Sequence, residues 1–313
     1  MGAIDSNLEP VLNDAEFRMF TELLRRHCGL HFGPESRFVF EKRLARRLRE
    51  LEIKSFGSYH YLLRNARPGD DEFANLIDEL TTNETYFLRE RSQLRALVSE
   101  IFAEIRLERR MRARGPISVW SAGCSSGEEP YSIVMLALDA GIDLKQELRV
   151  YASDISRKML RKARQGEYRE SSFRETEPQI REKYFTEKDG VWRISDTVKQ
   201  HVDFIHLNLV DRSRIALLGA MDVIVCRNVI IYFDVEGKRR VIETFHEKLR
   251  PGGHLLLGHA ETLINLSSSF ELRHLPRDLV YRKPSAGLMA ADPFHTAAAD
   301  ALMRVEEQRS RRS

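Results

Sequence analysis

The stretch ISVWSAGCSSGEEPYS, residues 117–132, decides the fold of this 313-residue chain. Apart from Ser118, its first four residues are β-branched or aromatic, as in a buried strand. Gly123 and Gly127 follow, and glycines there let the backbone turn tightly and approach a ligand closely. The chain then enters EPYSIVMLALDA, residues 129–140, which has a helical pattern. A strand, a glycine-containing loop and a helix in this order predict one unit of an α/β sheet.

The same alternation of strand and helix patterns continues toward the C-terminus. Helices are indicated over residues 156–166 and from about 235 to 249, where Arg-Pro-Gly-Gly ends the second one. This alternation predicts a mostly parallel sheet with helices on both faces. Residues 167–200 are too long for a simple connection, and KYFTEKDGVWRIS within them indicates a small antiparallel β insertion at about residues 181–201. The further strand candidates are LRVYASD (148–154), VDFIHLNL (202–209), DVIVCRN (222–228) and HLLLGHA (254–260).

The N-terminal third of the chain lacks β alternation. Residues 14 to about 112 show amphipathic helix patterns that are interrupted near 29–34, 54–57 and 67–70. We therefore predict four parts of the chain. They are an all-helical N-terminal domain (1–90), a linker helix (91–115), the sheet domain (116–284) and an Arg-rich tail that is helical or frayed (285–313).

The composition excludes several classes of protein. The 50 Lys and Arg residues nearly balance the 47 Asp and Glu residues, and the formal charge of +3 is too small for a general nucleic-acid coat. Three cysteines far apart, without ligand spacing, indicate neither disulfides nor a metal site and favour a reducing cytoplasm. The apolar runs are too short to span a bilayer. Gly2 and Ser6 match a myristoylation pattern, but no adjacent basic cluster supplies a second anchor.

Ligand-binding residues in such a sheet follow the carboxyl ends of the strands. After the first strand, Glu128 and Glu129 open the helix, where they would repel a diphosphate and favour a ligand that carries an ammonium and a sulfonium. The loop also lacks the third glycine of a dinucleotide fingerprint and the Gly-Lys pair of a P-loop. The alternative is that the two carboxylates merely complement the helix dipole.

Three other strand ends carry polar residues. Asp154 ends the second strand and is placed to accept both hydroxyls of a ribose, or alternatively to cap the helix that follows. Asn208 and Leu209 follow the third strand and can offer an amide and an apolar contact to an adenine. Arg227 and Asn228 break an apolar run, and because buried polar groups need partners we expect a ligand or a network there.

Several segments in one order carry a resemblance to a known family. TTNETYFLRE (81–90), by itself a helix cap plus a linker, is followed by WSAGCSSGEEPYS, ASDIS, LNL, CRNVIIYFD and GHAE. Over about residues 14–283 the chain resembles the CheR-type chemotaxis receptor methyltransferases, which methylate glutamate side chains of methyl-accepting chemotaxis receptors. The resemblance implies an all-helical domain joined to a class I S-adenosylmethionine-dependent methyltransferase fold, Rossmann-like, with a small antiparallel β insertion. It implies a protein-glutamate O-methyltransferase with S-adenosyl-L-methionine as cofactor and S-adenosyl-L-homocysteine as product.

The resemblance also implies roles for individual residues. Glu129 would meet the methionine ammonium and Asp154 the ribose. Arg89 and Tyr232 would be the catalytic residues nearest the reacting carboxylate. Cofactor binding is implied for Asn83, Thr85, Arg89, Gly123, Glu129, Asp154, Asn208, Leu209, Arg227 and Asn228.

The implied reaction needs no general base. A glutamate carboxylate has an ordinary pKa of about 4.3 and is ionised at neutral pH, so the enzyme has to position and desolvate it. We expect Arg89 to orient the carboxylate and Tyr232 to donate a hydrogen bond to its other oxygen. The alternatives are a cofactor-binding regulatory module without catalysis and a methyltransferase of another carboxylate substrate. No Asp/Asn-Pro-Pro-aromatic segment follows the fourth strand, which argues against a nucleic-acid methyltransferase.

The helix pattern RFVFEKRLARRLREL, residues 37–51, has a basic sector beside its apolar face. Arg43, Arg46 and Arg47 gather there, which indicates either a solvated face or, as the resemblance implies, a surface for the cytoplasmic methylation helices of the receptor. Some family members also bind a receptor C-terminal peptide through the β insertion, but the short loop at 186–190 argues against that mode here. We expect a cytoplasmic monomer that binds no nucleic acid, inserts into no membrane and holds no metal.

Overall fold

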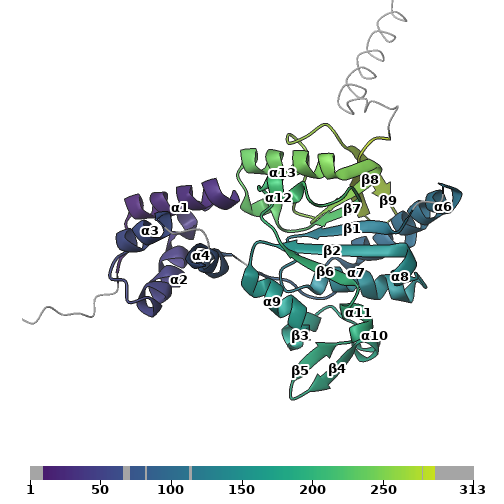
Figure 1. The fold of residues 1–313 in the computed structure, drawn as a ribbon, viewed down its shortest axis with the longest axis horizontal. Coiled ribbons are helices and arrows are strands. Elements are labelled where there is room, and N and C mark those ends of the chain that lie inside the picture. The colour runs from purple at the N-terminus through teal and green to yellow at the C-terminus, as the bar shows by residue number, and fades with distance from the viewer. Residues whose placement is uncertain (1–9, 66–70, 82, 113–114, 277, 286–313) are drawn as a thin grey trace, which may run out of the picture.

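The chain folds into two units. The computed structural model describes residues 10–65, 71–81, 83–112, 115–276 and 278–285. A small helical unit lies beside a larger unit built around a central sheet (Figure 1). The myristoylation pattern and nearly all of the Arg-rich tail lie outside the described residues. Within the described residues, no helix is both long and apolar enough to cross a membrane.

Local signals set the ends of the first helix of the helical unit. The side chain of Asn13 accepts the N–H of Glu16, and the Glu16 side chain accepts the N–H of Asn13, which is a capping box. The helix ends at Gly29, whose φ of 72° lies in the left-handed region that glycine tolerates. Apolar faces then meet in a core around Phe20 and Phe40. The helices are α1 (Asp14–Cys28), η1 (Pro34–Ser36), α2 (Arg37–Glu50), α3 (Phe56–Arg64) and α4 (Glu72–Leu80).

The central sheet has seven strands in the order β6-β2-β1-β7-β8-β10-β9. The first five run parallel, whereas β10 and β9 close one edge in antiparallel pairing, so the predicted mostly parallel sheet is confirmed. The strand order reverses at β1, which is where open α/β sheets bind ligands. The strands are β1 (Ile117–Ala122), β2 (Leu148–Asp154), β6 (Val202–His206), β7 (Met221–Cys226), β8 (Leu249–Leu257), β9 (Glu271–Leu275) and β10 (Asp278–Arg282).

Both faces of the sheet are buried. Along β1 and β7 successive side chains enter opposite cores, with Val119 and Val225 on one side and Trp120 and Ile224 on the other. Helix α7 covers the first face and α13 the second (Figure 1). Burial on both faces explains why these strands appear in the sequence as continuous apolar runs. The helices are α7 (Glu128–Asp139), α8 (Leu144–Glu147), α9 (Arg157–Gln165), α12 (Arg212–Ile215), η4 (Ile230–Tyr232) and α13 (Val235–Lys248).

The helix expected as a linker packs onto the sheet. Leu94, Leu97 and Ile101 are fully buried in the same core as β1 and α7. The apolar face of this helical segment therefore covers the sheet and does not bridge two domains. We propose that the boundary between the two units lies just before Asn83. The helical pieces are α5 (Arg91–Ala96), the π-helical η2 (Leu97–Phe102) and α6 (Ala103–Arg112).

The predicted β insertion is a three-stranded antiparallel sheet in the order β3-β5-β4. Its hairpin turns at Asp189 and Gly190, both with positive φ, as in the two-residue turn that suits antiparallel strands. The insertion begins earlier than expected, because β3 pairs with β5. Its elements are β3 (Glu167–Tyr168), η3 (Glu170–Phe173), α10 (Pro178–Tyr184), β4 (Phe185–Lys188), β5 (Val191–Ile194) and α11 (Asp196–Lys199).

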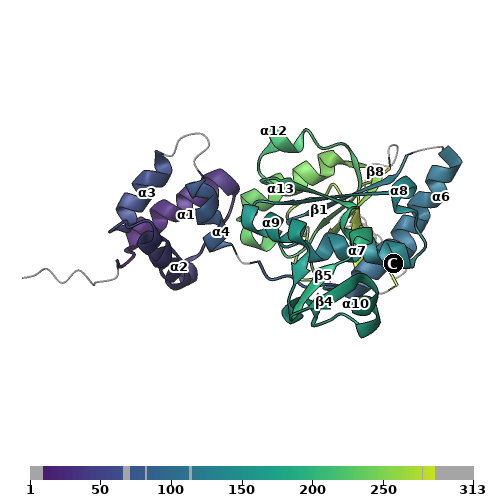
Figure 2. The same ribbon diagram turned by 60° about the horizontal axis from the view of Figure 1, so that its bottom comes forward.

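The helical unit sits at the carboxyl edge of the sheet. In both views α4 lies beside α9 (Figures 1 and 2). An isolated antiparallel bridge pairs Leu30 with Phe233, and the N–H of His31 donates to the carbonyl of Tyr232 at 2.8 Å. These contacts bring the segment after α1 against the loop after β7.

Candidate active site

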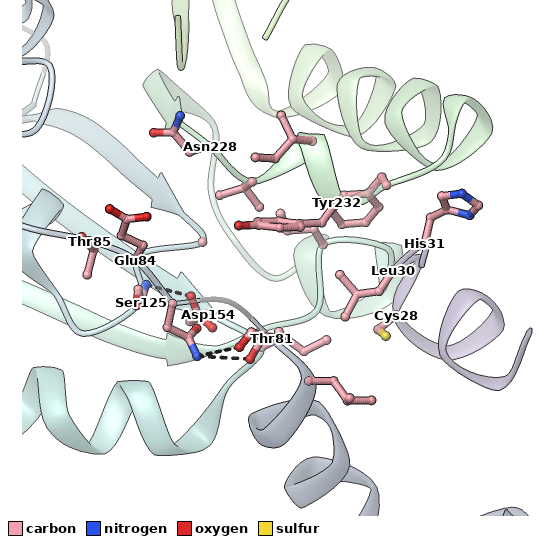
Figure 3. Close-up of a pocket in the computed structure, with 18 of the residues that line it drawn as sticks. Cys28, Leu30, His31, Thr81, Glu84, Thr85, Ser125, Asp154, Asn228 and Tyr232 are labelled. Atoms are coloured by element: carbon pink, nitrogen blue, oxygen red, sulfur yellow. Dashed lines mark hydrogen bonds between the residues drawn. The ribbon is translucent and has the colours of Figure 1, made fainter. Parts of the chain in front are cut away.

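A cavity of about 560 Å³ lies between the helical unit and the carboxyl edge of the sheet (Figure 3). This volume is typical of pockets for small molecules and cofactors. Its walls come from α2, from the segments after α1 and α4, and from the loops after β1, β2, β6 and β7. All the predicted cofactor and catalytic residues line it. They are Asn83, Thr85, Arg89, Gly123, Glu129, Asp154, Asn208, Leu209, Arg227, Asn228 and Tyr232.

Gly123 brings the loop after β1 close to the loop after β7. It has a φ of 84°, and its N–H donates to the carbonyl of Ser153 at 2.8 Å. A Cβ atom at this position would lie 2.5 Å from Cγ2 of Val229. A larger residue would push the two loops apart, so this wall of the cavity requires glycine.

Glu129 faces the cavity and is oriented by a buried arginine. Its Oε2 accepts from Nε of Arg227 and its Oε1 from the hydroxyl of Ser121, each at 2.8 Å. The Arg227 side chain is only 2% exposed, and its Nη2 donates to the carbonyl of Arg89 at 2.7 Å. Arg227 thus fixes the Glu129 carboxylate and joins it to the segment that leads out of the helical unit.

Glu128, the other acidic residue at the start of α7, does not line the cavity. Its carboxylate accepts from the hydroxyls of Ser126 at 2.8 Å and Ser172 at 3.1 Å, and the second of these belongs to the β insertion. Burial raises the pKa of Glu128. Of the two carboxylates expected to attract a cation, Glu129 is therefore the one placed to meet it.

Asp154 is a buried carboxylate held by backbone N–H groups. Its Oδ1 accepts the N–H of Ser156 at 2.8 Å. Its Oδ2 accepts the N–H of Ser125 at 2.8 Å, a bond that Figure 3 shows. Burial raises the pKa of Asp154, and these two bonds oppose the rise. The cap of α9 is Ser156, whose hydroxyl accepts the N–H of Met159, so the alternative interpretation of Asp154 as that cap is wrong. Each carboxylate oxygen retains a lone pair with which it can accept a ribose hydroxyl.

Two predicted amide ligands already make contacts within the chain. Nδ2 of Asn208 donates to the carbonyl of His27, at the end of α1, at 2.6 Å. Nδ2 of Asn83 donates to the hydroxyl of Thr81 at 3.2 Å. Asn208 thus joins the loop after β6 to the helical unit, and its contact with an adenine stays a prediction.

Arg89 and Tyr232 enter the cavity from separate parts of the chain. Nη1 of Arg89 donates to the carbonyl of Glu84 at 2.9 Å, and its guanidinium carbon lies 5.6 Å from the centre of the Tyr86 ring. Tyr232 lies in η4, after β7, and its side chain reaches into the cavity (Figure 3). Arg89 and Tyr232 thus bring a cation and a phenol hydroxyl to the same cavity.

Comparison with known proteins agrees with this architecture. Residues 83–278 match the family model described as CheR methyltransferase, SAM binding domain, and residues 15–81 match the CheR methyltransferase all-alpha domain. The chain belongs to the CheR methyltransferase family. Chemotaxis protein methyltransferase 2 of Vibrio cholerae is 40% identical over 89% of this chain and 96% of its own length. Relatives named chemotaxis protein methyltransferase from Pseudomonas aeruginosa and Escherichia coli are 34% and 35% identical over 86% and 84% of this chain, and these alignments cover 98% and 89% of the relatives.

The cavity fits the cofactor of this family, S-adenosylmethionine. Glu129 offers an oriented carboxylate to an ammonium group, and Asp154 offers acceptors to a ribose. Gly123 leaves room for a close approach, and the buried side chain of Leu209 adds an apolar surface. These features agree with the donor and acceptor groups of the cofactor.

Two contributions to this CheR-family site were not predicted from the sequence. The first is the wall formed by the helical unit, to which Leu30 and Val39 contribute. The second is Glu261 of the GHAE segment, a buried residue whose carboxylate accepts N–H groups from the loop after β7. Glu261 could have been predicted as a site residue, because it is an acidic residue just after an apolar strand. The part of the cavity wall that the helical unit forms could not, because it depends on how the two units pack.

The basic sector of α2 is engaged with α4. Nε of Arg47 donates to Oε1 of Glu72 at 2.9 Å, and Arg46 pairs with Glu79. Arg43 lines the cavity and donates to carbonyls at the end of α4, one of them at 3.0 Å. The side chain of Arg46 is 56% exposed, whereas that of Arg47 is 19% exposed. Receptor binding by this sector stays a prediction. Arg43 and Arg47 make contacts inside the helical unit, so Arg46, with the more exposed side chain, is the most accessible of the three to a receptor.

Proposed function

We propose that the chain transfers the methyl group of S-adenosyl-L-methionine to glutamate side chains of methyl-accepting chemotaxis receptors. The products are glutamyl methyl esters, which serve sensory adaptation. Family membership and the names of the relatives support methyl transfer in chemotaxis. The choice of a carboxylate as the acceptor is supported by Arg89 and Tyr232, which place a cation and a hydroxyl in the same cavity.

On the cofactor side, the residues of this chain bind and orient. Glu129 would hold the ammonium group, and Asp154 would accept the ribose hydroxyls because its own position is fixed by two backbone N–H groups. Leu209 and Asn208 would meet the adenine. When bound, S-adenosylmethionine supplies an electrophilic methyl group on a sulfonium.

On the acceptor side, the chain has to orient and desolvate an anion. A glutamate carboxylate is ionised at neutral pH, so no base has to remove a proton. Arg89 would bind one oxygen, and the Tyr232 hydroxyl would donate to the other. The thiols of Cys124 and Cys226 are buried and burial raises their pKa values, which removes them as nucleophiles of a competing mechanism.

One observation carries this proposal. Arg89 comes from the segment after α4 and Tyr232 from the loop after β7, yet both line the cavity that Glu129 and Asp154 also line. Groups suited to a carboxylate and groups suited to a cationic nucleoside therefore meet in one place. That is the arrangement that direct methyl transfer between the two requires.

Transfer of tritium from methyl-labelled cofactor to a receptor cytoplasmic fragment tests the proposal. We expect label that is released as methanol in alkali, as a methyl ester requires. Tyr232→Phe should lower the rate at least about tenfold and leave the dissociation constant of S-adenosylhomocysteine nearly unchanged. Tyr61→Phe, at an exposed position on α3, is the matched control. Alkali-stable label would contradict esterification of glutamate, and cofactor binding without any label would indicate a regulatory module.

We further propose that receptor recognition does not depend on a C-terminal peptide. The turn at Asp189 and Gly190 has two residues between β4 and β5, which leaves little loop to enclose a peptide. A peptide that copies the receptor C-terminus should compete poorly in the same transfer assay. Strong competition by this peptide would contradict the proposal and indicate that the β insertion binds the receptor C-terminus.

A further inference from the structure

The loop that carries Asn228 and Tyr232 has unusual backbone requirements. It leaves the sheet at Cys226, and Asn228 has a φ of 59°, in the left-handed region. The N–H groups of Asn228, Val229 and Ile231 lie beyond the last residue of β7 and need acceptors outside that strand. The conformation of this loop therefore depends on an acceptor supplied from elsewhere in the fold.

Glu261 supplies that acceptor. Its Oε2 accepts the N–H groups of Asn228 and Gly258, each at 2.8 Å. Its Oε1 accepts those of Val229 at 2.9 Å and Ile231 at 3.3 Å. One side chain thus binds three N–H groups of the loop after β7 and one of the turn after β8.

A carboxylate is the group that suits this arrangement. Both of its oxygens accept, whereas an amide would direct N–H donors at two of these backbone donors. Glu261 is 9% exposed, and among the described residues the hydrogen-bond partners of its carboxylate are the four backbone N–H groups. No arginine takes part, so the carboxylate shapes the loop instead of neutralising a cation.

Gly258 allows the turn to come this close to the loop. A Cβ atom on Gly258 would lie 2.7 Å from Nδ2 and 2.9 Å from the backbone N of Asn228. The turn after β8 and the loop after β7 are therefore packed backbone to backbone, with Glu261 as the bond between them.

We propose that Glu261 is a positioning residue for the methyl-transfer site. Glu261 is not among the described residues that line the cavity, and it holds the loop in the conformation that places Asn228 on the cavity wall and the Tyr232 side chain inside the cavity. This inference rests on the proposed function, because it concerns the residues assigned to the methionine end and to the acceptor carboxylate.

The test compares Glu261→Gln with Asp222→Asn. Asp222 is also a buried carboxylate that accepts a backbone N–H, but it lies at the opposite end of β7, away from the cavity. For both variants, kcat and KM for the receptor fragment, the affinity for S-adenosylhomocysteine and the thermal midpoint are measured. Rates are taken well below the midpoint, so that all of the protein is folded.

We expect Glu261→Gln to lower kcat at least about tenfold, with a change of less than about threefold in KM for the receptor. Asp222→Asn should lower the thermal midpoint and leave kcat within about twofold of wild type. A wild-type kcat in Glu261→Gln, or equal kcat losses in both variants, would overturn the proposal.

A second variant covers the case in which Glu261→Gln does not fold. Gly258→Ala keeps the carboxylate and displaces Asn228, so it should reproduce the loss of kcat in a folded protein; a wild-type kcat would overturn the proposal. Failure of the proposed function is distinguishable, because wild-type protein would then transfer no methyl group to the receptor fragment.

Discussion

The two ends of β7 place buried charges in contrasting surroundings. At the start of the strand, Asp222 accepts the N–H of Ser118 at 2.7 Å and pairs with Arg109 at 2.5 Å and Arg250 at 3.1 Å. Its charge is therefore fully matched by cations. At this end of the sheet, the partners of the buried carboxylate are all groups of the same chain.

At the carboxyl edge of the sheet, where β7 ends, two carboxylates accept backbone N–H groups. Asp154 and Glu261 are held in this way, and Glu129 shares Arg227 with Glu90, whose Oε2 lies 3.6 Å from the guanidinium. Backbone amides fix a carboxylate without adding a positive charge. The carboxyl edge thus presents the fixed carboxylates of Glu129 and Asp154 to the cavity, which suits a cationic ligand.

The difference shows how one strand can serve stability at one end and chemistry at the other. In a parallel sheet the loops after the strands gather at the carboxyl edge, where backbone N–H groups are free to bind side chains or ligands. The amino edge lies on the far side of the sheet, and its charges can be paired for stability. Variants at the amino edge should therefore affect stability alone, whereas variants at the carboxyl edge can affect binding and catalysis as well as stability.

The largest expected effect is that of Arg227→Met. The change leaves Glu129 and Glu90 buried without their cation, and breaking a buried pair costs about 3 to 5 kcal/mol in the free energy of unfolding. Urea denaturation measures this loss. Arg212→Met, which breaks an exposed pair with Glu247, should cost less than about 1 kcal/mol. Equal losses in the two variants would show that the network around Arg227 is no more important than a surface pair.

The next effect tests the amino edge through pH. His254 lies beside Val223 in the sheet, and burial, with Arg273 nearby, lowers its pKa from 6.5 to about 4. The unfolded chain binds this proton more readily, so stability is complete above pH 6.5 and falls as the pH drops toward 4, by about 3 kcal/mol in all.

Denaturation of wild type and His254→Gln between pH 7 and pH 4.5 provides the measurement. Because other groups also titrate, the informative quantity is the difference between the two slopes, and the variant should lose less stability on acidification. Identical slopes in the two proteins would contradict a buried neutral His254.

Asp154→Ala should have a smaller effect, directed at binding. Loss of charge-assisted hydrogen bonds to a ribose should weaken S-adenosylhomocysteine by about 1 to 3 kcal/mol in a calorimetric titration. The variant also loses the acceptors of Ser125 and Ser156, so its thermal midpoint should fall as well. Asp203→Ala, an exposed residue on β6, controls for charge. An unchanged dissociation constant would leave Asp154 as a support of the loop alone.

The smallest effect concerns the helical unit, where charges are paired as at the amino edge. Arg46→Glu should slow receptor methylation a few-fold at low ionic strength and leave S-adenosylhomocysteine binding unchanged. The effect should shrink at physiological salt, where exposed charges are screened beyond about 8 Å. Lys42→Glu, at another exposed position of α2, is the control for added negative charge. Normal methylation by Arg46→Glu at low salt would indicate that this face is only solvated and does not bind the receptor.

Much of the fold and the composition of the site could be predicted from local sequence. Apolar runs gave the parallel strands, and polar residues just after them gave Gly123, Glu129, Asp154 and Asn208, since the carboxyl ends of these strands meet at one edge. Strands β9 and β10 escaped prediction. Their charged and partly exposed residues, as in β9 with Arg273 between Leu272 and His274, lack the continuous apolar pattern of the buried strands.

By itself, then, the sequence determined the order of the elements, the edge of the sheet that carries the site and the residue types found there, because these follow from near-neighbour patterns. Tertiary structure decided which of those residues act on each other. Arg227 and Glu129 are 98 positions apart, Glu261 lies 33 positions from Asn228, and Arg47 meets Glu72 only because α4 packs on α2. Such pairs depend on long-range packing, so they cannot be predicted from the local spacing of residues.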